Sequence, residues 1–210
     1  MGLYAKNDIV NSDGKIIFEA DRVIERVVSG DDGSAEFVTD LPLGHYYLKE
    51  IQAPKGYVKS SQTIDVDASY KGADVKVIKL SAEFLNKPTK VQFSKTDITG
   101  EKELAGANLS IIDKDGKVLE FWKSEAGKSH LIEKLPIGKY TLREESAPYG
   151  YRVSRDVKFE VTESDEIQKV TMKDDYMMGT IVINKKDFDT KKTIACLLYT
   201  SPSPRDVEES

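Results

Sequence analysis

Residues 41–57 read LPLGHYYLKEIQAPKGY, and residues 135–151 read LPIGKYTLREESAPYGY. Both stretches fit the pattern L-P-x-G-x-Y-x-L-x-E-x-x-A-P-x-G-Y, and their glutamates, Glu50 and Glu144, lie 94 residues apart. Self-similarity at a fixed spacing is the sequence signature of repeated modules. A spacing of about 100 residues suits a small β-sandwich. The sequence therefore predicts tandem modules.

A second repeat marks the points where modules begin. The stretch VQFSKTD at 91–97 resembles IVINKKD at 181–187, at an offset of 90 residues. We therefore expect a first module over residues 1–88 that lacks its first strand, followed by a complete module over residues 89–177. Residues 178–195 are predicted to hold only the first strand of a third, truncated module.

The pattern between these motifs predicts an all-β fold of tandem immunoglobulin-like β-sandwich modules. Short runs of alternating apolar and polar residues are separated by Gly, Asp and Asn turns, which is typical of strands. Residues 31–33 and 113–116 are predicted to form hairpin-like turns. Residues 17–27 also fit a short helix, but we expect strand or loop there.

Composition excludes several classes of function. Hydrophobic residues make up 39% of the chain, and the net charge of −5 comes from interspersed acids and bases. A nucleic-acid-binding protein needs a clustered basic face, so no nucleic-acid partner is expected. The sequence shows no membrane segment and no signal peptide. It also lacks the spacings of metal, phosphate or nucleophile-elbow motifs, so no metal and no cofactor are expected.

The last residues are interpreted as an artefact of sequencing. Residues 196–206 read CLLYTSPSPRD, which is one reading frame of a transposase sequencing adapter. Segments of processing origin are excluded from fold reasoning. We therefore assign residues 196–210 to a translated adapter and expect them to be disordered. The single cysteine, Cys196, lies in this tail and is therefore assigned to the adapter as well.

Three ionisable residues are predicted to point into the core of the complete module. Side chains alternate between the faces of a strand, and Lys95, Glu144 and Asp174 each end an apolar row on one face. An unpaired buried charge is very unfavourable, so the three groups are expected to meet. From the pattern alone, they form either a buried salt bridge or groups that snorkel at the rim of the core.

Three motifs in order, FSKTDITGEKELAGA (93–107), YTLREESAPYGY (140–151) and VTMKDDY (170–176), resemble the Cna B-type domains of Gram-positive adhesins and pilins. This family, also called SpaA, has a prealbumin-like β-sandwich fold. The resemblance implies a self-made isopeptide bond without a cofactor. It assigns Lys95 as the nucleophile and Asp174 as the acceptor.

The resemblance also assigns Glu144 as the acid and base of the reaction. Strand parity favours Asp174 over its neighbour Asp175, which falls on the opposite face. Burial disfavours the charged forms of amines and carboxyls, and a positioned carboxyl can relay protons. An amine and an acid held in contact can then form an amide and release one water.

The other modules carry incomplete equivalents of this set. The first module has Glu50 and an Asn-type acceptor, Asn86, but the expected lysine is absent, and Lys6 falls on the wrong strand. We therefore predict no cross-link in the first module. The third module keeps Lys185, but its sequence contains no equivalent of the glutamate or of the acceptor.

The leading functional hypothesis is a structural stalk or repeat region of a cell-surface adhesin or pilin, located outside the cell on the cell wall. A ligand-binding module that recognises a host protein or carbohydrate is the alternative, because function resides in sites grafted on folds. An enzyme is disfavoured, because the candidate groups face the core rather than a substrate. The expected partners are a host extracellular matrix protein or neighbouring surface subunits.

Overall fold

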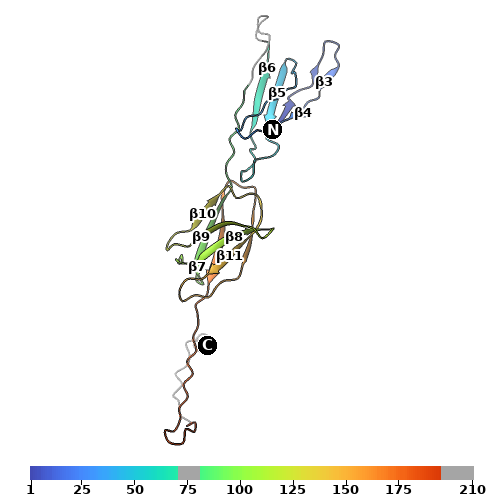
Figure 1. The fold of residues 1–210 in the computed structure, drawn as a ribbon. Coiled ribbons are helices and arrows are strands. Elements are labelled where there is room, and N and C mark those ends of the chain that lie inside the picture. Colours follow the sequence, from blue (N-terminus) through green and yellow to red (C-terminus); the bar gives the residue numbers. More distant parts are fainter. Residues whose placement is uncertain (71–80, 195–210) are drawn as a thin grey trace, which may run out of the picture. The chain divides into compact units, whose positions relative to one another are not determined.

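The structure, a computed structural model, describes residues 1–70 and 81–194. Within these two ranges the chain forms β-strands and no helix, which confirms the all-β prediction (Figure 1). The chain divides into two compact units, Met1–Tyr176 and Met177–Ser210. A membrane-crossing helix of sufficient length and apolarity is absent from the described ranges. The adapter assignment, residues 196–210, lies outside the described residues.

The larger sheet of the second module has four antiparallel strands in the order β12-β11-β8-β9. Its strands are β8 (Asn108–Asp113), β9 (Val118–Lys123), β11 (Gly138–Ser146) and β12 (Val157–Val161). The predicted turn joins β8 to β9: the Asp113 side chain accepts bonds from the N–H groups of Asp115 and Lys117, both at 2.9 Å. Gly116 supplies the positive φ of 82° that this turn requires.

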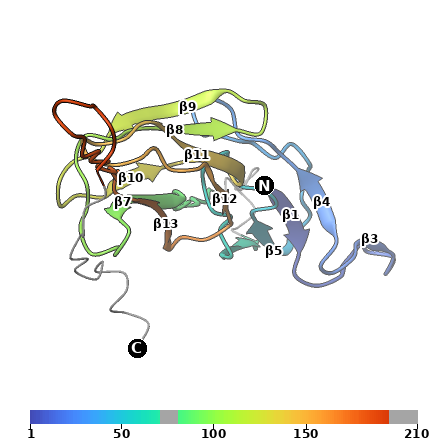
Figure 2. The same ribbon diagram turned by 90° about the horizontal axis from the view of Figure 1, so that it is seen from below.

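The smaller sheet of the second module pairs its first and last long strands directly. The order is β10-β7-β13, with β7 (Lys90–Asp97), β10 (His130–Glu133) and β13 (Ile167–Asp174). β7 and β13 lie side by side (Figure 2). They run parallel along their whole length, so that Lys95 lies opposite Met172. Parallel neighbours need a long crossover connection, and the rest of the module supplies it.

The core of the second module lies between these two sheets. Its buried apolar side chains come from both sheets: Val91, Phe93, Ala107, Leu109, Ile111, Leu135, Tyr140, Leu142, Val161 and Met172. Phe93 packs edge-on against Phe159 at a centroid distance of 5.3 Å, and Phe159 in turn stacks on Tyr140. The alternation read from the sequence therefore corresponds to inward and outward faces.

The first module repeats the larger sheet with equivalent strands. Its order is β4-β1-β5-β6, with β1 (Gly2–Ala5), β4 (Val23–Arg26), β5 (Gly44–Lys49) and β6 (Thr63–Ala68). A two-stranded hairpin pairs β2 (Ile9–Val10) with β3 (Ile16–Phe18). Residues 17–27 therefore form strand and loop, as expected. Among the described residues of this module, the buried apolar cluster consists of Leu3, Ala5, Ile9, Tyr46 and Ala68.

The tyrosine that follows each L-P-x-G turn of the shared motif has the same structural role in both modules. The Tyr46 hydroxyl donates a hydrogen bond to the Pro42 carbonyl, and the Tyr140 hydroxyl donates one to the Pro136 carbonyl, each at 2.7 Å. This bond to a backbone carbonyl four residues upstream resembles the tyrosine corner of β-sandwiches. It fixes the entry of the chain into the strand that leads to the repeat glutamate.

The predicted turn at residues 31–33 forms, although β-strands do not flank it in the described residues. Gly33 has a positive φ of 78°, and backbone bonds run from the Gly30 N–H to the Ser34 carbonyl at 2.9 Å and from the Gly33 N–H to the Gly30 carbonyl at 3.0 Å. The predicted first strand of a third module, at 181–187, is not formed. Within residues 177–194 a single isolated β-bridge joins Lys186 to Thr193. A strand needs a neighbour to satisfy its backbone groups, and the described part of this unit offers none. The module boundaries stay a prediction.

Candidate functional site

Lys95 enters the core from β7. It occupies an inward position after Val91 and Phe93, and only 2% of its surface is exposed. Its backbone is held on both sides, because its N–H donates to a Glu103 carboxylate oxygen at 2.9 Å and its carbonyl accepts from Leu104 at 2.7 Å. A lysine held this rigidly inside a β-sandwich requires acidic partners.

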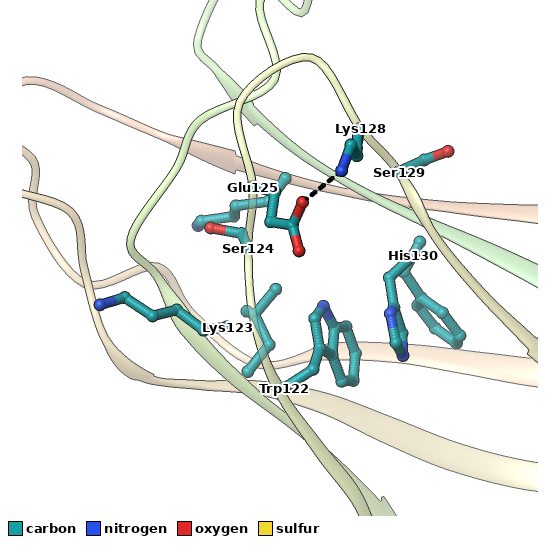
Figure 3. Close-up of a pocket in the computed structure, with 10 residues that line it drawn as sticks. Trp122, Lys123, Ser124, Glu125, Lys128, Ser129 and His130 are labelled. Atoms are coloured by element: carbon teal, nitrogen blue, oxygen red, sulfur yellow. Dashed lines mark hydrogen bonds and ion pairs between the residues drawn. The ribbon is translucent and has the colours of Figure 1, made fainter.

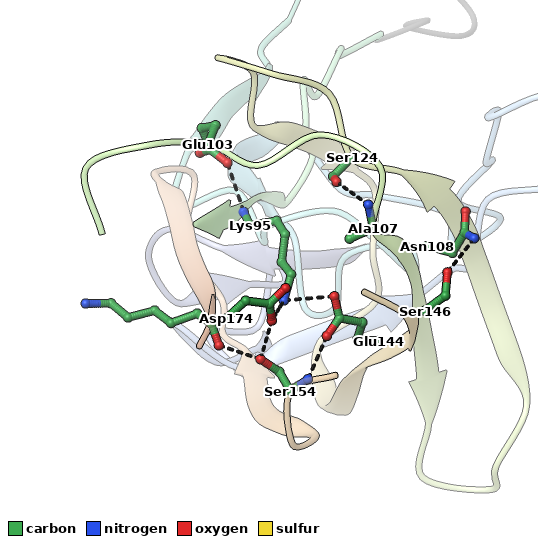
Figure 4. A network of polar contacts seen from close by, with 10 residues as sticks. Lys95, Glu103, Ala107, Asn108, Ser124, Glu144, Ser146, Ser154 and Asp174 are labelled. Carbon is green, nitrogen blue, oxygen red and sulfur yellow. Dashed lines mark hydrogen bonds and ion pairs between the residues drawn. The ribbon is translucent and has the colours of Figure 1, made fainter. Parts of the chain in front are cut away.

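Asp174 is the first of these partners and ends the neighbouring strand β13. It is fully buried, at 0% exposure, whereas Asp175 is exposed, as strand alternation predicts. The Lys95 Nζ contacts Asp174 Oδ1 directly (Figure 4). The second oxygen, Asp174 Oδ2, has no hydrogen-bond partner among the described residues. A buried polar atom without a partner is uncommon in folded proteins.

Glu144 reaches the same point from the opposite sheet. It lies on β11 after Tyr140 and Leu142, is 4% exposed, and places Oε1 3.0 Å from the Lys95 Nζ. Burial is the main cause that raises the pKa of the Glu144 carboxyl above its ordinary value of 4.5. The Ser154 N–H that donates to Glu144 and the neighbouring Lys95 amine oppose this rise of the pKa, and the nearby Asp174 carboxyl adds a smaller increase. Glu144 is therefore suited to hold a proton in the core.

Ser154 is a member of the site that the sequence reasoning missed. It lies between β11 and β12, and its N–H donates to Glu144 Oε2 at 2.6 Å. Its hydroxyl is 2.5 Å from Asp174 Oδ1 (Figure 4). A signal was present in the repeats, because a serine follows the glutamate by ten residues in both modules, as Ser60 and as Ser154.

The first module holds its glutamate in a similar way but with other neighbours. Glu50 is 3% exposed, and its Oε2 accepts the Ser60 N–H at 2.6 Å. The Asn86 side-chain amide donates to the same oxygen at 2.6 Å and to the Val58 carbonyl at 3.0 Å. The structure thus brings the predicted acid and the predicted acceptor of this module together.

The two lysines considered from the sequence outside the second module, Lys6 and Lys185, do not lie in such a site. Lys6 lies on the surface, where its Nζ pairs with Asp65 at 2.8 Å. Lys185 is exposed in the C-terminal unit, and its backbone carbonyl accepts a hydrogen bond from Ile194 at 3.0 Å. Neither position brings a buried amine to an acidic pair.

A cavity of about 120 Å³ opens from the surface of the second module toward Lys95. Its lining includes Lys95 and Phe93 together with the polar side chains of the β9–β10 connection. Trp122 and His130 stack at one side of it, with ring centroids 4.4 Å apart (Figure 3). Burial lowers the pKa of the His130 imidazole below its ordinary value. Lys95 lines this cavity but is itself only 2% exposed.

Residues 1–70 and 81–194 contain no group of three or more His, Cys, Asp or Glu side chains arranged to hold a metal ion. The site described above consists of one amine, Lys95, and two carboxyls, Glu144 and Asp174, which are all buried.

Solved structures resemble this chain over much of its length. The Bacillus anthracis TIE protein is 31% identical, with a TM-score of 0.49, and the match covers 71% of this chain and 28% of that one. GBS52, the minor pilin of Streptococcus agalactiae, is 18% identical, with a TM-score of 0.41 and coverages of 80% and 74%. BcpA, the major pilin subunit of Bacillus cereus, is 18% identical, with a TM-score of 0.36 and coverages of 43% and 31%.

The chain thus spans about 28% of the length of the first of these proteins. No curated protein matches it. The sequence profile of the SpaA prealbumin-like fold domain matches residues 4–81 and again residues 89–176. Since these two matches account for more than half of the chain, the protein belongs to the family of SpaA prealbumin-like fold domains.

Proposed function

We propose that this chain is part of the stalk of a Gram-positive adhesin or pilin, and that its second module closes an isopeptide bond between Lys95 and Asp174. The observation that carries the proposal is the contact of the Lys95 Nζ with Asp174 Oδ1, with Glu144 Oε1 3.0 Å away. All three groups are at most 4% exposed. Membership of the SpaA family and the tandem modules support the stalk role.

The reaction joins the Lys95 Nζ to the Asp174 side-chain carbon and expels one oxygen as water. A neutral amine attacks a protonated acid, so a nitrogen–carbon bond forms and a carbon–oxygen bond breaks. Glu144 takes one proton from the attacking nitrogen and passes one to the departing oxygen. The neutral reactants carry all the protons needed, so no further reagent enters.

Position and burial supply the driving factors for this chemistry. Reacting groups that are fixed in contact reach effective concentrations of about 10⁵–10⁸ M. Burial favours the neutral forms of the amine and the acids, which are the forms that react.

The product is a covalent bond within the chain, and water is the only molecule released. The reacting groups face the core, so the arrangement supports a single turnover within the chain. The bond closes a loop over a sequence separation of 79 residues. By the chain-entropy estimate for a cross-link, such closure stabilises the folded state by about 4.5 kcal/mol. The module would thereby gain the staple that small extracellular domains often take from disulfides.

At the level of the whole protein, the role we propose is to hold other domains away from the cell surface. The expected site is the outer face of the cell wall. The expected partners are neighbouring surface subunits or a host extracellular matrix protein that binds elsewhere on the protein.

The bond is tested by intact mass spectrometry of the full chain under denaturing conditions. The wild-type chain should be one water lighter than its sequence requires, and proteolysis should release a branched peptide that joins Lys95 to Asp174. The Lys95→Ala and Glu144→Gln variants should have the full mass. Asp175→Ala is the matched control and should still lose water. A folded wild-type chain with the unmodified mass would leave only a buried salt bridge.

A further inference from the structure

Ser154 touches both carboxyls of the proposed reaction. Its N–H donates to Glu144 Oε2 at 2.6 Å, and its hydroxyl lies 2.5 Å from Asp174 Oδ1. The same hydroxyl also contacts the backbone carbonyl of Lys173. One residue in the connection between β11 and β12 therefore links the sheet that bears Glu144 to the strand that bears Asp174 (Figure 4).

The hydrogen-bonding capacity of the hydroxyl restricts how these contacts can be satisfied. A serine hydroxyl has one proton to donate and lone pairs to accept. The Lys173 carbonyl can only accept, so the Ser154 proton is used there. The remaining contact, between Ser154 Oγ and Asp174 Oδ1, is then satisfied when Oδ1 carries a proton and donates it. The chain of bonds runs from Asp174 through Ser154 to the Lys173 carbonyl.

We propose that Ser154 is a further catalytic residue, which holds the acid proton on Asp174 Oδ1 and so marks this oxygen as the one that leaves. This inference rests on the proposed isopeptide reaction and assigns its leaving group. The bond from the Asp174 side-chain carbon to Oδ1 breaks. Oδ1 departs as water with its own proton and with a proton from Glu144, which takes one from the Lys95 nitrogen in exchange. Oδ2 becomes the carbonyl oxygen of the new amide.

The first module shows that the shared fold does not by itself bring the serine hydroxyl into contact with the acceptor. Ser60 makes the same backbone bond to Glu50, at 2.6 Å. Its hydroxyl oxygen instead accepts the N–H of Gln62 at 3.2 Å. Where the acceptor is Asn86, the leaving group would be ammonia and no acid proton has to be held. The bond from the serine N–H to the glutamate thus occurs in both modules. The contact of the serine hydroxyl with the acceptor occurs only in the module whose acceptor is an aspartate.

The test measures the rate at which the full chain loses water. Wild-type, Ser154→Ala and Ser154→Thr chains are made by cell-free synthesis, stopped in acid at intervals and weighed intact. Ser154→Ala keeps the N–H on Glu144 but loses the hydroxyl, so bond formation should slow by about 10- to 100-fold, the low end of the range for proton-transfer catalysis. Ser154→Thr retains a hydroxyl and should restore the rate to within a few-fold of wild type.

A second measurement separates catalysis from folding. In the Glu144→Gln background, where no bond should form, Ser154→Ala should shift the midpoint of thermal unfolding by no more than a few degrees. A large rate loss with a small shift supports the inference. Ser154→Ala chains that react at the wild-type rate, or Ser154→Thr chains as slow as Ser154→Ala, would overturn it. A wild-type chain that never loses water would instead overturn the isopeptide reaction itself.

Discussion

The two modules hold their repeat glutamates alike and surround them differently. Glu50 and Glu144 are both buried, and each accepts the N–H of a serine ten residues later at 2.6 Å. In the second module a buried lysine and an aspartate complete the group. In the first module the partner is Asn86.

This difference separates the framework of the site from its chemistry. The glutamate and its backbone donor belong to the larger sheet and the loop after it, which both modules possess. The amine and its acceptor belong to the smaller sheet, where β7 and β13 pair. The described residues of the first module contain no such pair of strands. The proposed reaction would therefore depend on the second sheet, whereas the shared motif alone provides only the buried glutamate.

The largest expected effect comes from removing the amine. Lys95→Ala should abolish the loss of water and lower the thermal midpoint of the second module by about 20–30 °C, because a contribution of about 4.5 kcal/mol is lost. Differential scanning calorimetry and intact mass together check this. Lys6→Ala in the first module is the control and should change neither the mass nor the midpoint of the second module. Equal midpoints for Lys95→Ala and wild type would contradict a stabilising bond.

A smaller difference is expected between the two repeat leucines. Leu142 is fully buried in the second core, whereas Leu48 is only partly buried in the first. Leu142→Ala should lower the free energy of unfolding of its module by about 3 kcal/mol, within the range for buried leucines. Leu48→Ala should lower that of the first module by about 1 kcal/mol. Chemical denaturation followed separately for each module measures both values, and the comparison fails if the order is reversed.

The next effect concerns pH in the absence of the bond. Because burial raises the pKa of Glu144 in the folded state above 4.5, the folded protein binds this proton more tightly than the unfolded chain does. In a Lys95→Ala background the contribution of Glu144 should thus be fully present below pH 4.5 and be lost as pH rises through the higher folded pKa. The slope should be at most about 1.4 kcal/mol per pH unit.

Denaturation midpoints between pH 4 and pH 8 measure this slope. The Lys95→Ala/Glu144→Gln double variant should lack this contribution and show a flatter profile. The Lys95→Ala/Glu50→Gln variant, altered in the first module, should retain the fall. A profile that is unchanged by Glu144→Gln would mean that Glu144 does not hold a proton in the core.

The smallest effect is expected on the outer face of the same strand. Arg143 forms a two-point ion pair with Asp156, at 3.1 and 2.7 Å, but both side chains are substantially exposed to solvent. Exposed pairs contribute about 0–1 kcal/mol, so Arg143→Ala should lower the free energy of unfolding by about 0.5 kcal/mol. Lys49→Ala, at the equivalent exposed position of the first module, should have almost no effect. If Arg143→Ala lowered the free energy of unfolding by more than about 2 kcal/mol, the pair would contribute more than an exposed ion pair does.

Alternation along strands was enough to predict which side chains would meet. Lys95, Glu144 and Asp174 each extend an apolar row, and a strand has only two faces. For the same reason Asp174 could be chosen over Asp175, which the structure places on the surface. The motif resemblance added the proposed reaction, which parity alone does not distinguish from a salt bridge.

Loops and unpaired strands were harder to predict. Ser154 lies in a connection without periodicity, so nothing in its local sequence indicates the direction of its hydroxyl. Comparison of the two repeats would have identified it as a candidate, since Ser60 has the same place after Glu50. The stretch 181–187 has the pattern of a strand but forms none. Such a pattern describes a single strand, which also needs a hydrogen-bonded neighbour, and the described residues do not supply one.

The parallel pairing of β7 with β13 has a consequence for a molecule under tension. A pull on the two ends of the module enters at Lys90 and leaves after Asp174. With the bond formed, the load would run along β7 to Lys95, cross to Asp174 and bypass the 78 residues in between. Without it, unravelling those residues would lengthen the chain by about 260 Å, at about 3.3–3.6 Å per residue. With the bond formed, the second module would thus keep its length under tension and would not extend by unfolding.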